Sequence, residues 1–209
     1  MQQPADFEVL LHDHVPPQAL RYCLNLCREI PFTLRLAPGR VTKAGDFAVR
    51  QNRFFISVNR DLNPYLFLLT FIHEIAHAVV YCRHANRCEA HGPEWKTTFR
   101  ELMEPLLTVE VFPADLLACL KQHLQNPSAS SFSDTALTRC LRQYDAPDGL
   151  AFLADLPERT VFQLQSRWFI KGPARRKRFV CCDMRTKKIY LVPGQALVRV
   201  QQQSLFAAG

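Results

Sequence analysis

The sequence lacks several features that would define a class at once. It contains no pair of C-x-x-C motifs, so its eight cysteines predict neither a zinc ribbon nor a disulfide framework. No basic flank precedes an apolar stretch near the N-terminus, so no secretory signal is visible. No internal repeat is evident. These absences favour a cytoplasmic protein whose thiols stay mostly reduced and buried.

Long apolar runs are also scarce. The longest, YLFLLTFIHEIAHAVVY, covers 17 residues from Tyr65 to Tyr81 and carries His73, Glu74 and His77 in its middle. A membrane-spanning helix needs about 20 predominantly apolar residues, so this run is too short and too polar to be one. No membrane partner is therefore expected.

The composition suits one domain with a small module attached. A chain of 209 residues with 48% hydrophobic and 22% charged residues can bury a sizeable core. The positive charge is unevenly placed, because residues 146–209 hold eleven Lys and Arg against four Asp and Glu. Residues 1–145 hold fifteen of each sign. The whole net charge of +7 therefore belongs to the last third of the chain.

The hydrophobic patterns predict an α+β fold. A helix is expected after Pro17, strands at FTLRLAP, GDFAVR and NRFFISVNR, and helices around HEIAH and after HGPEWK. The small, polar stretch QNPSASSFSD is the one convincing linker. Beyond it, β-branched and aromatic runs predict three to four short antiparallel strands. The predicted organisation is a first domain at 1–125, a linker at 126–145 and a basic β module at 146–209.

The HEIAH motif predicts a metal site. Positions i and i+4 of a helix lie about 40° apart around its axis, so the imidazoles of His73 and His77 point the same way. Glu74 lies beside them, within reach of a water molecule on a shared cation. Three polar side chains in so apolar a helix would each cost several kcal/mol if they had no partner, and a bound metal with water would satisfy them together.

A catalytic zinc usually takes three protein ligands, so a third ligand is sought downstream. The candidates are His84, Cys82, Cys88, Glu89, His91 and Glu94. His91 is preferred because Gly92 and Pro93 place it at a tight turn that could bring it back over the HEIAH helix. Glu94 is the main rival, although its place in the first turn of a helix is already explained by the helix dipole.

From about Pro17 to Leu107 the chain resembles the SprT-like metallopeptidases, a family that includes proteases of DNA–protein crosslinks. The resemblance rests on HEIAH followed by HGPEWK, and on the FFISVNRDL strand before the active helix. It implies a zincin-like domain with one catalytic zinc held by His73, His77 and His91, and with Glu74 as the catalytic base. Trp95 would be structural and would pack the helix that follows the third ligand.

Many members of that family carry a C-terminal zinc ribbon with two cysteine pairs. Here only Cys181 and Cys182 are present, so a metal-free β module related to the ribbon is expected. Seven of its basic residues are candidates for nucleic-acid binding, with aromatic residues nearby for stacking on bases. They are Lys171, Arg175, Arg176, Lys177, Arg178, Lys187 and Lys188. The opposing interpretation is a solvated turn that keeps the module soluble.

The sequence therefore predicts a monomeric zinc peptidase that hydrolyses protein substrates, including proteins attached to DNA. Tyr81 and Arg83 both remain open as the group that stabilises the oxyanion. The alternative is a non-catalytic nucleic-acid-binding adaptor, whose structural zinc would need a fourth protein ligand such as Cys82, Cys88 or Glu94. A nucleotide deaminase is a weak rival, because the sequence has neither H-x-E nor P-C-x-x-C.

Overall fold

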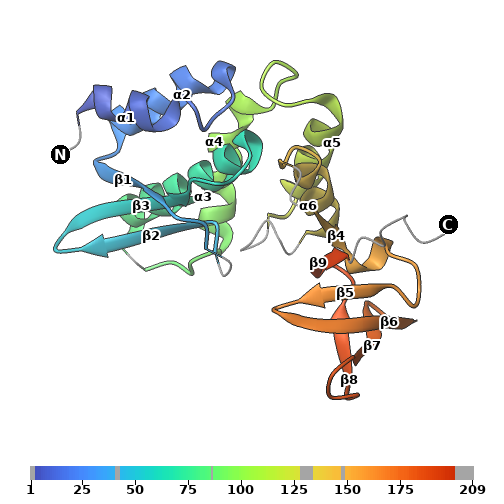
Figure 1. Ribbon diagram of the computed structural model, residues 1–209. Coiled ribbons are helices and arrows are strands. Elements are labelled where there is room, and N and C mark those ends of the chain that lie inside the picture. The colour runs from blue at the N-terminus through green and yellow to red at the C-terminus, as the bar shows by residue number, and fades with distance from the viewer. Residues whose placement is uncertain (1–2, 41–42, 86, 128–133, 147–148, 201–209) are drawn as a thin grey trace. The chain divides into compact units, whose positions relative to one another are not determined.

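The computed structural model describes residues 3–40, 43–85, 87–127, 134–146 and 149–200 (Figure 1). The chain divides into two compact units, Met1–Asp145 and Ala146–Gly209. The first unit combines helices with a three-stranded sheet, and the second is built on a six-stranded antiparallel sheet. The predicted α+β class with a second, antiparallel sheet is confirmed.

The sheet of the first unit is ordered β1-β3-β2, with β3 parallel to β1 and antiparallel to β2. Its strands are β1 (Phe32–Ala37), β2 (Gly45–Arg50) and β3 (Arg53–Asn59). Gln51 and Asn52 both have positive φ, which gives the tight turn that joins β2 to β3. Strand β2 is left at an edge of the sheet, and the candidate metal site lies beside it.

Among the described residues of the first unit, six helices and a short 3-10 turn accompany this sheet. Their bounds are α1 (Pro4–Leu11), α2 (Pro17–Glu29), α3 (Pro64–His84), α4 (Pro93–Met103), η1 (Glu104–Leu106), α5 (Ala114–His123) and α6 (Thr135–Arg142). Helix α3 packs against β2, β3 and α4 (Figure 1). Phe67, Leu68, Phe71, Ile72 and Ile75 on α3 are all fully buried, so this helix forms the centre of the core.

Helix α3 has well-defined ends. The Asn63 side chain accepts hydrogen bonds from the backbone amides of Tyr65 and Leu66, and Pro64 occupies the first helical position. At the other end Ala85 adopts the left-handed conformation. The helix is long and apolar enough to cross a membrane, but 67% of its most apolar window is buried inside the unit. Length and composition are therefore weak evidence of a membrane span.

Helix α6 corrects the predicted linker at 126–145. The Asp134 side chain caps this helix by accepting from the amides of Ala136 and Leu137, and its apolar face joins the core of the first unit. A disulfide joins Cys119 on α5 to Cys140 on α6, which corrects the expectation that these thiols are unpaired. The prediction failed because a short helix follows the polar stretch; positions 128–133 of that stretch lie outside the described residues.

Over its described part, 149–200, the second unit forms six strands in the order β4-β9-β5-β6-β7-β8. Their bounds are β4 (Leu150–Phe152), β5 (Val161–Leu164), β6 (Arg167–Arg175), β7 (Arg178–Asp183), β8 (Ile189–Pro193) and β9 (Leu197–Val200), with a 3-10 turn η3 (Leu153–Asp155). This exceeds the three to four strands predicted. Gln165 and Ser166 take positive φ and divide one predicted run into β5 and β6, a turn after Pro193 divides another into β8 and β9, and β4 precedes the predicted runs. Phe162, Phe169 and Cys181 lie in the small core.

Candidate metal centre

Three imidazoles meet in the first unit. The Nε2 atoms of His73, His77 and His91 lie 3.1–3.2 Å apart in all three pairs. In a tetrahedral zinc site with Zn–N bonds of about 2.0–2.1 Å, two ligand nitrogens lie about 3.3–3.4 Å apart. The observed triangle fits that spacing closely. The donor set therefore fits a zinc ion, and three protein ligands would leave one position open.

The environment keeps these imidazoles neutral, which is the form that binds a metal. Burial lowers the pKa of His73 to about 3 and that of His77 to about 4, and the neighbouring imidazoles act in the same direction. Burial also lowers the pKa of His91. Three neutral rings that turn their Nε2 atoms toward one point make a poor mutual hydrogen-bond set but a good set of ligands for a cation.

Local structure explains how the rings converge. His73 and His77 are one turn apart on α3, and His91 lies in the loop that leads through Gly92 into α4. Trp95 on α4 is fully buried behind all three, with ring centroids 4.5, 5.4 and 4.7 Å from those of His73, His77 and His91. Trp95 in turn stacks on Phe99 at 4.9 Å. This aromatic packing limits the rotation of the imidazoles.

Glu74 lies in the same cavity, which has a volume of about 400 Å³. Its side chain is buried, and this burial, followed by the charge of Asp46, raises the pKa of Glu74 to about 8. Lys43 and Arg40 act in the opposite direction. A carboxyl group beside a metal-ligand cluster, in the cavity that the cluster lines, is placed as a general base would be.

Strand β2 forms one wall of this cavity through Gly45, Asp46 and Phe47. The Phe47 ring lies parallel to that of His77, with 6.4 Å between their centroids. The sequence reasoning assigned no role to Gly45. A glycine at the start of a strand is nevertheless a signal of close backbone approach, and that signal is visible in the sequence alone.

The alternative third ligands lie outside the cluster of ligand atoms. Among the described residues, the only group of three or more His, Cys, Asp or Glu side chains close enough to share an ion is His73, His77 and His91. Cys88 lies on the cavity wall but outside that group, and Cys82 is exposed. A fourth protein ligand for a closed, structural zinc is not among the described residues.

The structure distinguishes the two open candidates for oxyanion stabilisation, Tyr81 and Arg83. Tyr81 lines the cavity, one turn beyond His77 on α3. Arg83 is exposed and lies 3.7 Å from the Glu101 carboxylate on α4. Of the two, Tyr81 alone lines the cavity.

The basic residues of the second unit fall into two turns and one buried position. Those in or next to the turn between β6 and β7, and those in the turn between β7 and β8, are exposed: Arg175, Arg176, Lys177, Arg178, Lys187 and Lys188. Lys171 is the exception, because it is only 3% exposed and donates to the carbonyl oxygens of Leu156 and Ala154. Its assignment to nucleic-acid binding is corrected: it lies on the inward face of β6, as Phe169 does.

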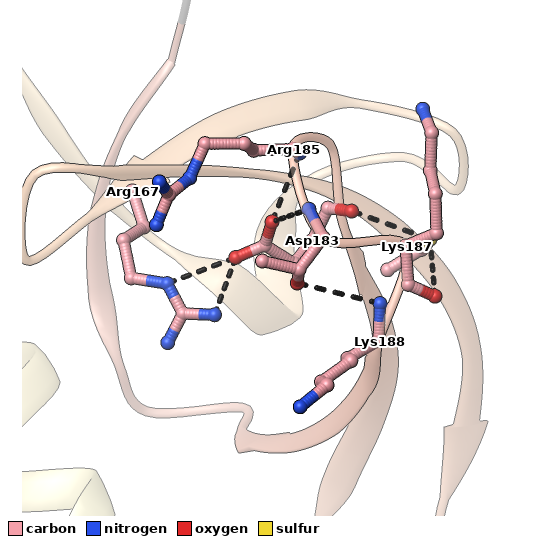
Figure 2. Close-up of polar contacts among 7 residues, drawn as sticks. Arg167, Asp183, Arg185, Lys187 and Lys188 are labelled. Atoms are coloured by element: carbon pink, nitrogen blue, oxygen red, sulfur yellow. Dashed lines mark hydrogen bonds and ion pairs between the residues drawn. The ribbon is translucent and has the colours of Figure 1, made fainter.

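Asp183 organises the turn that carries Lys187 and Lys188, a role that sequence reasoning missed (Figure 2). Its carboxylate accepts from the amides of Arg185 at 2.9 Å and Thr186 at 2.7 Å, and from two nitrogens of the Arg167 guanidinium. These contacts lower the pKa of Asp183 to about 2. The hydrogen bond from the Thr186 amide has the largest effect, and the Arg167 guanidinium acts in the same direction. An aspartate that opens a turn in this way is a recognisable sequence signal.

These observations define the class of protein: an α+β chain with a three-histidine metal-binding cluster beside a buried glutamate. A family model described as the SprT-like family matches residues 35–115. The SprT-like resemblance is thus confirmed over this segment, which contains β2, β3, α3, α4 and the whole histidine cluster. The family match is consistent with a zinc metallopeptidase. No curated protein and no solved structure matches the chain.

Proposed function

We propose that this chain is a zinc metallopeptidase with a zincin-like active site, in which His73, His77 and His91 hold one zinc ion and Glu74 is the general base. The observation that carries the proposal is the triangle of Nε2 atoms, 3.1–3.2 Å on each side, in the cavity that Glu74 also lines. The SprT-like match over residues 35–115 supports it.

The chain's own groups supply the proton transfers. Zinc bound at this site would supply a Lewis acid that polarises a carbonyl group and acidifies water. The Glu74 carboxylate accepts the proton of the attacking water and gives it to the nitrogen of the leaving amine. The three imidazoles remain neutral throughout, since burial keeps their pKa values low. The net reaction is hydrolysis of a peptide bond.

The substrate is proposed to be protein, including protein attached to or near DNA. The exposed basic residues of the two turns in the second unit support a nucleic-acid partner, because clustered Lys and Arg bind phosphates. They are Arg175, Arg176, Lys177, Arg178, Lys187 and Lys188. We further propose that the protein acts as a monomer; the Cys119–Cys140 disulfide, of a kind rare in the cytosol, leaves the cytoplasmic location a prediction.

The peptidase proposal is tested with Glu74→Gln, which preserves shape but removes the base. Zinc content is measured by X-ray absorption at the zinc edge, and hydrolysis is followed on an unfolded protein substrate. We expect zinc to be retained and kcat to fall by about 100-fold or more. The matched control is Glu89→Gln, an exposed carboxylate on the same cavity wall, which should leave kcat within about twofold.

The outcomes separate this proposal from the adaptor. Wild-type protein that binds zinc and DNA but hydrolyses no protein substrate would favour the non-catalytic adaptor. Zinc binding with unchanged affinity in His91→Ala would show that the three-histidine site is wrong.

The nucleic-acid role is tested separately by reversing Arg175, Arg176, Lys177 and Arg178 to Glu. Removing each phosphate-binding side chain should lower the slope of log K against log salt by about 0.7–0.9, and an unchanged slope would refute that role.

A further inference from the structure

Strand β2 passes unusually close to the proposed general base. A Cβ atom added at Gly45 would lie 2.6 Å from Glu74 Oε1, 2.9 Å from Glu74 Cγ and 2.6 Å from Thr70 Cγ2. Real Cβ atoms essentially never approach heavy atoms closer than 3.0 Å. We infer that Gly45 is a positioning residue: its missing side chain allows the strand to hold the Glu74 carboxylate in place for proton transfer. This inference rests on the proposed function of Glu74.

Neither partner in this contact can retreat. Gly45 opens β2 and pairs with Val58 of β3 in the antiparallel ladder, so the strand is fixed from its other side. Glu74 is only 6% exposed, and its helix is the core helix of the unit. Phe47, two residues along β2, lines the same cavity as Glu74. Any side chain at position 45 must therefore displace the carboxylate itself.

The backbone at Gly45 does not require glycine. Among the described glycines, Gly149 is the one with positive φ, so alanine fits the conformation of Gly45 without strain. Gly39 offers a contrast: a Cβ there would meet Asp61 at 2.0 Å, but Asp61 is exposed and free to swing away. Glycine is therefore needed at position 45 because the strand lies against the buried Glu74 carboxylate and its helix, and not because of the backbone conformation.

The expected effect is on turnover and not on metal binding. Misplacing a catalytic group by about 1 Å can lower a rate by about 100-fold. Gly45→Ala should therefore lower kcat by about 10- to 100-fold, with KM within about threefold and zinc affinity unchanged, because the clash involves none of the three imidazoles. Ala48→Gly is the matched control, since it changes one methyl group on the same strand and should leave kcat within about twofold.

A double-mutant cycle tests the contact without relying on activity. The reference is full-length Thr70→Ser protein, in which the second clash is removed. Its thermal midpoint is compared with the midpoints of the same protein carrying Gly45→Ala, Glu74→Ala or both. We expect Gly45→Ala to lower the midpoint by about 4–8 °C, and by less than about 2 °C once Glu74 is truncated. A Gly45→Ala variant that fails to fold, while the double variant folds, supports the inference equally.

Equal costs of Gly45→Ala in both backgrounds would overturn the inference, because the added methyl would then clash with something other than Glu74. Full recovery of kcat in Gly45→Ala with Thr70→Ser would overturn it too, by assigning the loss to the Thr70 contact. A wild-type protein without hydrolytic activity would refute the proposed peptidase function alone. The thermal cycle would still show whether Gly45 positions the carboxylate.

Discussion

Lys171 gives a sharp test of how the second unit is held together. It is a lysine inside the core of a small sheet, where its ammonium group donates to the carbonyls of Ala154 and Leu156 and lies 3.9 Å from the centroid of the Phe179 ring. Lys171→Met keeps the length and apolar stem of the side chain but removes every one of these interactions. The exposed Lys177→Met is the control for loss of a positive charge.

The magnitude follows from the groups that remain. Two carbonyl oxygens lose a charged donor, and each costs about 1–3 kcal/mol if it stays buried and unpaired. The interaction with the Phe179 ring contributes about 1–2 kcal/mol more. Against this, methionine avoids the cost of burying an ammonium group, and water near the exposed Ala154 can satisfy part of the loss. We expect a net loss of about 2 kcal/mol in unfolding free energy, or about 30-fold in the equilibrium constant.

Hydrogen-exchange mass spectrometry on peptides that cover β6 and β7 measures this loss within the intact protein. Lys171→Met should speed the slowest exchange by about 30-fold, whereas Lys177→Met should change it by less than about threefold. Since the Lys171 ammonium is buried, its loss should leave the salt dependence of DNA binding unchanged, and Lys177→Met should lower that slope by about 1. Unchanged exchange, or a DNA slope lowered as much by Lys171→Met as by Lys177→Met, would refute this reasoning.

Three further predictions concern the first unit's active helix, its disulfide and the turn of the second unit. Asn63→Ala removes both the cap of α3 and a donor to the Leu141 carbonyl, so urea denaturation should show a loss of about 2 kcal/mol, and about half of that for Asn63→Ser. Equal losses of unfolding free energy in the Asn63→Ala and Asn63→Ser variants would contradict the role of Asn63 as the helix cap. Cys119→Ser opens a link with a sequence separation of 21 and should lower the unfolding free energy by about 3 kcal/mol; no loss against the oxidised wild type would contradict it. Asp183 stabilises the fold above its ordinary pKa of about 4, and that stabilisation is lost as the pH falls through about 2. The amide resonance of Thr186 should titrate with a midpoint near 2, and a midpoint near 4 would show that the turn does not hold the carboxylate.

The prediction of individual elements succeeded where the local pattern was complete. The HEIAH helix carries its own cap at Asn63, its helix-starting Pro64 and an apolar run, and the structure places it at the centre of the core. Helix α6 was missed because its capping residue, Asp134, was assigned to the polar linker. Lys171 was misjudged because charge was counted along the chain, and charge alone does not show which face of a strand a residue occupies.

The sequence by itself determined the ligands that lie on one helix, because the spacing of His73 and His77 is a property of helical geometry alone. It also determined the α+β class and the SprT-like resemblance, since these depend on local periodicity and on short motifs. Only the tertiary structure decided how His91 returns to that helix and that Gly45 lies against Glu74. Contacts of that kind join residues far apart in sequence, and the packing of a whole core sets their distances.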